Sequence, residues 1–317
     1  MAEERRRRRR LSRPDPLTRP EEASHLVDMH ELAIVHQITR LESAEQLDPV
    51  VKKAETLFGA ILKPRWLRDL LHGVPLGHPL HPVAVQVPVG AWVSAAFLDL
   101  VPGAAKASRV LVGIGVLSAL PAIVTGWTDW LYLHDQQKRV GVVHAATNSI
   151  ALGLYTLSFI QRGRGGGKVL AFAGLGVASA GAFLGGHLAY RQAAGANHTE
   201  DVPHLFPAGW HPLGSLTDLP EGELHRVEVA GQPLLVVRRG DTVQVLSNTC
   251  SHLSAPLDEG TLIGAHTDNP CVECPWHQST FELRTGDVVH GPATSPQPRF
   301  ESRTVNGILQ VMLPGAG

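Results

Sequence analysis

The stretches CSHLSAPLDEG at residues 250–260 and CPWHQSTF at residues 274–281 decide how the last third of the chain folds. Each stretch opens with one cysteine and one histidine in a tight turn, Cys250 with His252 and Cys274 with His277. A [2Fe–2S] cluster needs four ligands, two on each iron, and two imidazoles can replace two thiolates on one iron. The two pairs meet this requirement, so these four residues are the candidate cluster and metal ligands.

The residues around the two pairs are typical of β-structure. Short runs rich in β-branched residues alternate with turn residues, which predicts antiparallel strands. Asn306-Gly307 is a strong signal for a type I′ hairpin. The expected strands are 224–229, 233–238, 242–246, 300–305 and 308–313. We therefore expect a small all-β sandwich or barrel over residues 213–317.

This domain resembles the Rieske [2Fe–2S] family. The resemblance extends beyond the two pairs to further residues of the motif and to a proline loop: Leu253, Gly260, Phe281, Gly286-Asp287, Gly291-Pro292-Ala293, Pro296 and Pro298. It implies that the thiolates hold the buried iron and the histidines the solvent-facing iron, with the proline loop over the cluster. It also implies transfer of single electrons through the histidine-ligated iron.

The sequence departs from the family pattern at three places. The segment 253–273 between the pairs is somewhat longer than usual, which suggests an insertion around residues 264–270. Gln278 stands where many members have glycine. Ser251 follows Cys250, and only Cys271 is spare, so the disulfide pair of the bc1-complex subfamily is absent. We expect behaviour closer to a Rieske ferredoxin than to the quinol-oxidising type.

A structural zinc site is the alternative for the cysteines. Cys271-x-x-Cys274 is also half of a zinc-ribbon pattern. Two separate Cys/His turns with a proline loop behind them favour the iron–sulfur cluster, and Cys271 is then an ordinary strand residue. His266 and His290 are close to the motif in sequence, and we interpret both as surface loop residues.

Four apolar stretches precede this domain, at residues 82–101, 108–132, 140–160 and 168–190. A helix needs about 20 apolar residues to cross a bilayer. The stretches contain few charges and are joined by short connections, which favours membrane spans over the buried helices of a soluble bundle. The expected fold is α+β and multidomain, with a four-transmembrane-helix bundle over residues 73–194 followed by the all-β domain.

The membrane part also resembles a known family. The motifs are Gly77-His78-Pro79-Leu80-His81-Pro82, Gly126-Trp127-x-Asp129-Trp130, and His144 with Asn148. They are similar to those of a bacterial family of four-helix membrane domains that is often fused to Rieske domains. That resemblance implies a fold but no chemistry.

The remaining segments are polar or amphipathic. We expect a disordered Arg/Pro-rich tail at 1–38, an amphipathic helical segment at 39–72 and a linker at 195–212. The formal net charge of −1 gives no reason to expect a nucleic-acid partner. With only three cysteines, a disulfide framework is not expected.

Four spans place both termini on the same side of the membrane. Lysine and arginine in the short loops nearly balance between the two sides, so they do not decide the orientation. The arginine run 5–10, without a following apolar signal segment, favours the cytoplasmic side. We expect an integral protein of the bacterial plasma membrane, with the termini and the Rieske domain in the cytoplasm.

Four histidines near the span ends are candidates for a second site: His78, His81, His144 and His187. The order of the spans places them at the face from which the β domain continues. Ionisable residues in membrane segments are functional candidates. Three interpretations stay open: structural histidines at the interface, a haem b held by two of His81, His144 and His187, or a quinone site.

Together these patterns predict a membrane-anchored Rieske electron carrier with redox donor and acceptor partners. We expect a carrier or oxidoreductase component and not a stand-alone enzyme, because the 40 residues after His277 leave no room for a mononuclear iron domain. The alternatives are a redox-sensing or assembly module without turnover, and a redox subunit working with a haem or quinone in the membrane domain.

Overall fold

The computed structural model describes residues 33–315. The chain divides into two compact units, residues 1–40 and residues 41–317. In the first unit the described part is the beginning of helix α2 (Ala33–Glu42), so a helix starts within the segment expected to be a tail. The rest of that expectation, including the arginine run, lies outside the described residues. The second unit contains the membrane helices and the β domain.

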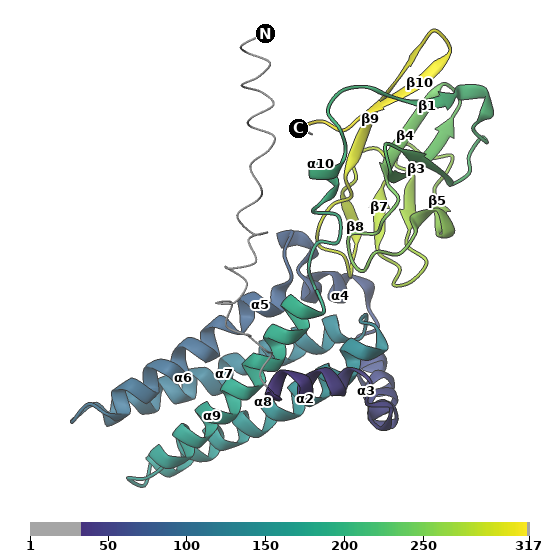
Figure 1. The fold of residues 1–317 in the computed structure, drawn as a ribbon. Coiled ribbons are helices and arrows are strands. Elements are labelled where there is room, and N and C mark those ends of the chain that lie inside the picture. Colours follow the sequence, from purple (N-terminus) through teal and green to yellow (C-terminus); the bar gives the residue numbers. More distant parts are fainter. Residues whose placement is uncertain (1–32, 316–317) are drawn as a thin grey trace, which may run out of the picture. The chain divides into compact units, whose positions relative to one another are not determined.

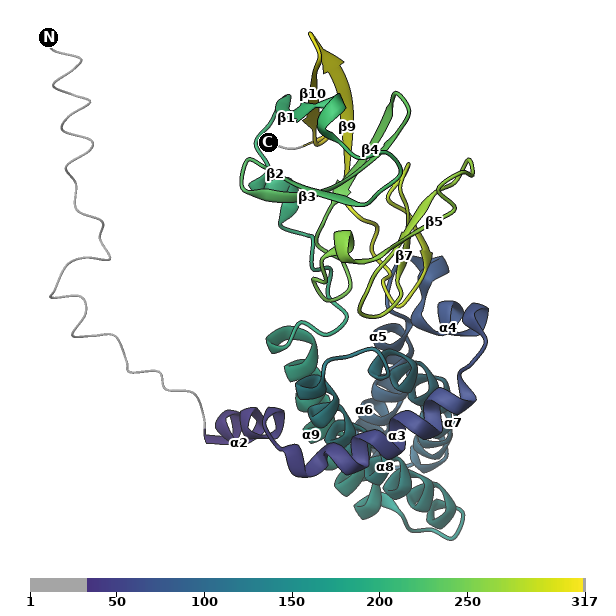
Figure 2. The same cartoon turned by 90° about the vertical axis from the view of Figure 1, so that its right-hand side faces the viewer.

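Four helical segments of the second unit are long and apolar enough to cross a membrane: Leu80–Asp99, Ala105–Trp130, Asp135–Arg162 and Lys168–Arg191. They are built from α5 (Leu80–Ala84) with α6 (Gln86–Asp99), α7 (Ala105–Trp130), α8 (Asp135–Arg162), and α9 (Lys168–Gly186) with the π-helical turn η5 (His187–Arg191). Figures 1 and 2 show these helices side by side as a bundle. The predicted four-span domain is confirmed. The boundaries differ from the prediction by at most five residues, and the fourth span starts at Lys168 as predicted.

The bundle is held by aromatic stacking in its interior and by charges at one end. Trp92 on α6 stacks on Tyr155 on α8 with ring centroids 4.2 Å apart. At the end of the bundle far from the β domain, the buried carboxylate of Asp99 is ion-paired with Arg162. Lys168 donates to the backbone oxygen of Asp99 at 2.7 Å. These contacts join the ends of α6, α8 and α9.

Short helices lie before the first span. They are the end of α2, η3 (Glu45–Leu47), α3 (Asp48–Ile61), α4 (Arg65–His72) and η4 (Val74–Leu76). Pro49 lies in the first turn of α3, where its missing N–H costs no hydrogen bond, so it begins this helix and does not interrupt it. Arg139 on α8 donates to both carboxylate oxygens of Asp48. This pair attaches α3 to the bundle.

The β domain contains two antiparallel sheets, of six strands in the order β1-β10-β9-β4-β3-β2 and of four in the order β5-β6-β7-β8. The strands are β1 (His211–Ser215), β2 (His225–Val229), β3 (Gln232–Arg239), β4 (Thr242–Ser247), β5 (Thr261–Ile263), β6 (Cys271–Glu273), β7 (Thr280–Glu282), β8 (Val288–His290), β9 (Arg299–Val305) and β10 (Ile308–Met312). Five of them coincide with the predicted runs. Asn306 and Gly307 both have positive φ, as a type I′ hairpin requires.

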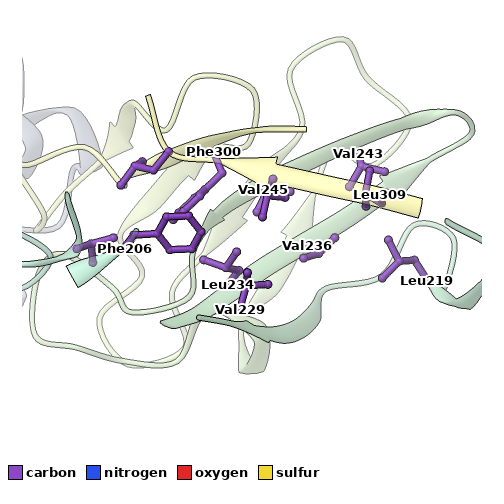
Figure 3. Close-up of a cluster of buried hydrophobic side chains, with 12 residues drawn as sticks. Phe206, Leu219, Val229, Leu234, Val236, Val243, Val245, Phe300 and Leu309 are labelled. Atoms are coloured by element: carbon purple, nitrogen blue, oxygen red, sulfur yellow. The ribbon is translucent and has the colours of Figure 1, made fainter. Parts of the chain in front are cut away.

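The larger sheet has its own hydrophobic core, which Figure 3 shows. Val236, Val245 and Leu309 come from three of its strands and are almost fully buried. Phe206 joins them from the segment before β1, next to α10 (Val202–Leu205), and its ring contacts that of Phe300. Part of the segment expected to be a linker therefore packs into the β domain.

The smaller sheet shares a second core with the loops that follow β4 and β6. Its buried residues include Leu257, Phe281 and Leu283, together with both candidate cysteine ligands. Apolar packing therefore surrounds the place where the two Cys/His turns meet.

Candidate metal centre

The two Cys/His turns have matching backbone geometry. The N–H of Cys250 donates to the oxygen of Ala255, and the N–H of Cys274 donates to the oxygen of Ser279, each at 2.8 Å. The fourth residue after each cysteine, Ser254 and Gln278, has φ of +64°. A positive φ explains why glycine is common at the second of these positions. The two turns therefore form a pseudosymmetric pair, one from each of two distant stretches.

The two thiols lie together inside this pair of turns. Cys250 and Cys274 are 0% and 2% exposed, and their side chains are hydrogen-bonded to each other. That hydrogen bond lowers the pKa of Cys274 to about 7, with help from the N–H groups of His277 and Trp276. The same hydrogen bond, together with burial, raises the pKa of Cys250 well above its usual range. Because thiolates are the form that binds metals, both thiols lose their protons when they bind a metal.

The two histidines face each other beside the thiols. The rings of His252 and His277 have centroids 5.0 Å apart and are nearly perpendicular, at 87°. Burial lowers the pKa of His252 well below its usual range, and it lowers the pKa of His277 to about 4. Both imidazoles are therefore neutral at physiological pH, as ligation to a metal requires.

One buried atom of this site lacks a partner in the protein. Nδ1 of His252 is buried and makes no hydrogen bond. An unpaired buried nitrogen is costly unless something else bonds to it. A metal ion at this nitrogen removes the cost. The donor set consists of two thiols and two neutral imidazoles, and Nδ1 of His252 has no other partner. This set fits a [2Fe–2S] cluster with two protein ligands per iron.

Among residues 33–315, no three His, Cys, Asp or Glu side chains converge on the position of a single metal ion. The candidate ligands instead form two pairs, the thiols and the imidazoles. This arrangement suits a binuclear cluster, in which each iron takes only two protein ligands. A structural zinc ion usually has four ligands around one centre.

The loop that carries Cys250 is fixed by the buried side chain of Gln297 in the proline loop. Its oxygen accepts from the N–H of Ser251 at 2.8 Å, and its nitrogen donates to the oxygens of Ser247 and Thr249 at 3.0 and 2.7 Å. Ser279, in the other turn, accepts from the N–H of Ala293 through its hydroxyl. The proline loop is thus bonded to both Cys/His turns.

Comparison with known proteins agrees with this geometry. Residues 209–301 match the family model described as Rieske [2Fe-2S] domain. The anthranilate 1,2-dioxygenase ferredoxin subunit of Burkholderia cepacia is 39% identical over 105 residues, which are 33% of this chain and 92% of the relative. The chain belongs to the Rieske [2Fe–2S] family. The cofactor of this Rieske domain is a [2Fe–2S] cluster, and the ferredoxin relative supports a role in electron transfer.

Two further proteins similar to the Rieske domain are also ferredoxins. Ferredoxin CarAc of Metapseudomonas resinovorans is 35% identical and aligns over 32% of this chain and 92% of its own length. The solved ferredoxin of carbazole 1,9a-dioxygenase from Nocardioides aromaticivorans IC177 is 31% identical, covering 32% of this chain and 95% of that one, with a TM-score of 0.30. Residues 77–198 match the family described as predicted membrane protein (DUF2231), so the chain also contains a membrane domain.

The histidine edge of the Rieske domain faces the membrane domain. His134, between α7 and α8, has its ring centroid 5.6 Å from that of His277 and 5.3 Å from that of Trp276. His72, at the end of α4, is buried and lies 2.7 Å from Asp129. A small cavity beside the proline loop is lined by His72, Asp129 and His252. The candidate ligand His252 is thus separated from the bundle by only a narrow space.

Helix α4 makes the polar contacts between the two domains. Arg65 donates to Glu273 at 3.3 Å and to the hydroxyl of Thr280 at 2.8 Å. The carboxylate of Asp69 bonds with the ring of His290 and accepts from the N–H of Gly291 at 3.0 Å. We expected His290 to be an ordinary surface loop residue, but it belongs to this contact. The α4 residues had no recognisable motif, so only the fold brings them here.

The four candidate histidines of the membrane domain do not form one cluster. His81 and His144 lie together, with ring centroids 6.4 Å apart. His78 is exposed. The buried ring of His187 has its Nε2 2.7 Å from Glu42, next to the end of α9. The structure therefore pairs two of the four and separates the other two.

Proposed function

We propose that this chain is a membrane-anchored Rieske electron carrier, with the cluster bound by Cys250, His252, Cys274 and His277. The observation that carries the assignment is the meeting of the two matched turns, which pairs thiol with thiol and imidazole with imidazole. The unpartnered, buried Nδ1 of His252 supports it, because metal ligation gives this atom a partner. Once bound, the cluster supplies the exchange of one electron at a time.

The protein groups around the cluster have separate roles. Burial of both cysteines keeps water from the thiolate-ligated half of the site. His277 is only partly buried, whereas His252 is buried, so the ring of His277 is the more accessible of the two. Because this edge faces the membrane domain through His134, we propose that electrons pass to or from a redox partner at the membrane face.

The relatives suggest what such a carrier does. The ferredoxin subunit of anthranilate 1,2-dioxygenase belongs, by its name, to an oxygenase system. We propose the same general role here, delivery of single electrons, with the difference that this carrier is attached to a membrane. The four apolar spans provide the anchor. We place the Rieske domain on the cytoplasmic side because the arginine run 5–10 favours retention there.

The cluster assignment is tested on the full-length protein purified in mild detergent. We expect about two iron and two sulfide per chain, by the stoichiometry of the cluster, and a rhombic paramagnetic resonance signal after reduction with dithionite. Cys274→Ser should lose this signal. Cys271→Ser is the matched control, because Cys271 is only three residues away and outside the paired turns, and it should keep the signal. A preparation that contains zinc in place of iron contradicts the assignment.

The anchor and its orientation are tested in the native membrane. The protein should stay in the membrane fraction after carbonate washing. A protease added to inverted vesicles should remove the Rieske domain, whereas the same protease added to intact spheroplasts should not. The reverse pattern of cleavage would place the domain on the outer side. Stable partner binding that changes with cluster reduction, without electron transfer, would favour the redox-sensing alternative.

A further inference from the structure

The bundle contains a pair of histidines from different helices. His81 lies on α5 and His144 on α8, and their rings are 6.4 Å apart between centroids, with planes at 82°. At 1.5 Å per residue, His144 is roughly 13 Å along α8 from Asp135, so it lies within the span and not at its end. Both side chains are partly buried. His81 is the second residue of the first span, so the pair lies towards the end of the bundle that is nearer the Rieske domain. Two imidazoles facing each other between apolar spans are candidates for a function.

Backbone hydrogen bonds fix the protonation of both rings. Nδ1 of His81 lies 2.8 Å from the oxygen of Ala122 on α7, and Nδ1 of His144 lies 2.9 Å from the oxygen of Gly181 on α9. A carbonyl oxygen only accepts, so each Nδ1 must carry the proton. Each Nε2 is then the unprotonated nitrogen of a neutral ring. Nδ2 of Asn148 lies 3.4 Å from Nε2 of His144, but it donates to the backbone oxygen of His144 at 2.9 Å. An imidazole whose other nitrogen donates to a carbonyl is the usual arrangement of a metal-binding histidine.

Glycines allow α7 and α9 to approach the two rings. A Cβ at Gly126 would lie 2.8 Å from the ring of His81, and a Cβ at Gly185 would lie 3.0 Å from the ring of His144. Either methyl group would press on an imidazole carbon. All four helical segments therefore take part, two by supplying a histidine and two by supplying a carbonyl and a glycine. Such positioning of both rings resembles a prepared site more than two independent structural histidines.

The neighbouring histidines show what the ordinary structural role is. His187 pairs with Glu42, and His72 pairs with Asp129, so each ring has a carboxylate partner. No acidic partner of this kind accompanies His81 or His144. Among the residues described, no third His, Cys, Asp or Glu joins them to complete a three-ligand metal site. The pair therefore offers two imidazole nitrogens, with the neutral amide of Asn148 beside His144 and no acidic ligand among the described residues.

The spacing and the charge identify the ligand class. A metal–imidazole bond of about 2.0–2.1 Å, with the radius of the ring, sets the centroids of two imidazoles on opposite sides of one metal about 6 Å apart. The observed 6.4 Å is close to this value. A bare divalent ion with only two neutral ligands would leave its full charge in a low-dielectric region. Haem avoids both problems, because the macrocycle supplies four more ligands and compensating negative charge.

We propose that His81 and His144 are the two axial ligands of a b-type haem inside the membrane domain. The proposal goes beyond the cluster and does not depend on it. Nε2 of each histidine would bind the iron, and the carbonyls of Ala122 and Gly181 orient the two rings. His78 and His187 are not ligands.

The experiment uses full-length protein in mild detergent, made in cells supplied with a haem precursor. We expect one haem per chain, by the two-ligand count, with the spectrum of low-spin six-coordinate iron and sharp α and β bands after reduction. His81→Ala and His144→Ala should each abolish this spectrum. His78→Ala is the matched control, a histidine in the same motif with an exposed ring, and it should keep the full spectrum. The iron–sulfur resonance signal is recorded on the same samples.

Two further measurements separate ligation from folding. Added imidazole should restore the low-spin spectrum of His81→Ala and His144→Ala, because it can occupy the vacated position. His144→Met should keep the haem but raise its midpoint potential, as methionine ligation does.

If the protein binds no haem even after addition of haemin, or if both alanine variants keep the low-spin spectrum, the proposal is wrong. A copper or zinc ion lost in the same two variants would also overturn it, as would a quinone in place of a metal. An intact iron–sulfur signal in those samples would show that the cluster proposal still stands.

Discussion

Nδ1 of His290, in the Rieske domain, lies 2.8 Å from the carboxylate of Asp69, on the short helix before the first membrane span. The second carboxylate oxygen of Asp69 accepts from the N–H of Gly291, the next residue. One side chain therefore binds two adjacent groups at the start of the proline loop. Because that loop is bonded to both Cys/His turns, Asp69 connects the membrane domain to the cluster site.

Replacing Asp69 by alanine should loosen this contact. Hydrogen bonds to a charged group contribute about 1.5–3 kcal/mol when well buried, and the ring of His290 is 36% exposed, so screening reduces the effect. A loss of about 1 kcal/mol raises the open fraction roughly fivefold. Limited proteolysis of the segment between the domains should speed up accordingly, with the cluster spectrum unchanged. Asp218→Ala, which changes an exposed carboxylate of the Rieske domain, is the control, and the protease should cleave it at the wild-type rate. Equal rates for both variants would show that Asp69 does not hold the domain.

Gln297→Ala should weaken the hold on the cluster. The substitution leaves the N–H of Ser251 and the oxygens of Ser247 and Thr249 without partners. Each buried unpaired group costs about 1–3 kcal/mol, so a loss of roughly 3 kcal/mol or more is expected. Denaturation followed by the visible absorption of the cluster should show the loss at lower denaturant concentration. The control is Gln310→Ala, whose side chain bonds only to Arg303 at the surface. A midpoint unchanged in Gln297→Ala would remove the loop-fixing role of this residue.

Cys271 should react with a thiol reagent more slowly than a free cysteine does. Burial raises its pKa, and the negative charge of Glu282 raises it further. A raised pKa means that less thiolate is present at a given pH below the pKa, so alkylation at pH 8 should be slower than for a free cysteine. The rate should rise steadily towards alkaline pH. Glu282→Gln should increase the alkylation rate of Cys271 at pH 8. If Cys271 of the wild-type protein reacts as fast as a free cysteine, its pKa is not raised and the prediction is wrong.

The Asp99–Arg162 pair should behave as a buried ion pair. Both side chains are almost completely buried, and Ser108 also donates to Asp99 at 2.7 Å. Arg162→Met leaves a buried carboxylate without its partner, which costs about 3–5 kcal/mol. The double variant Asp99→Leu with Arg162→Met should recover much of this loss, because no unpaired charge remains. Thermal unfolding in detergent measures both. Arg164→Met, two residues along and exposed, serves as the control. If the double variant is as unstable as the sum of the single ones, the two residues are not coupled.

Much of the fold could be predicted because strong local signals describe it. The length of the apolar stretches predicts the spans, and alternation with turn residues predicts the strands of the larger sheet. The main error at a span is the start of α8, which begins at Asp135 and not near residue 140. Polar residues end the apolar run there, but the helix continues because His134 and Gln137 form a capping box.

The candidate site could be predicted in part. Spacing alone brings Cys250, His252, Cys274 and His277 into consideration, and the structure places them together, although their ligation stays a prediction. The contact residues Arg65, Asp69 and His134 could not be found in this way. Arg65 and Asp69 contact residues 208 and 221 positions away, and the partner of His134 is His277, also far away in the sequence. No local pattern distinguishes the three from other polar residues. For the membrane histidines, sequence identified the group, but only packing separates the His81–His144 pair from His78 and His187.

Two of the attachments between the Rieske domain and the membrane domain differ in kind. One is covalent, through the chain after the last span, where the N–H of His198 donates to the oxygen of Ser251. The other is the contact of Asp69 with His290 and Gly291. In mechanical terms the first is a hinge and the second a latch. Because His134 also lies against His277, a redox partner from outside the chain would have to displace this contact, and the latch with it, to reach the histidine edge.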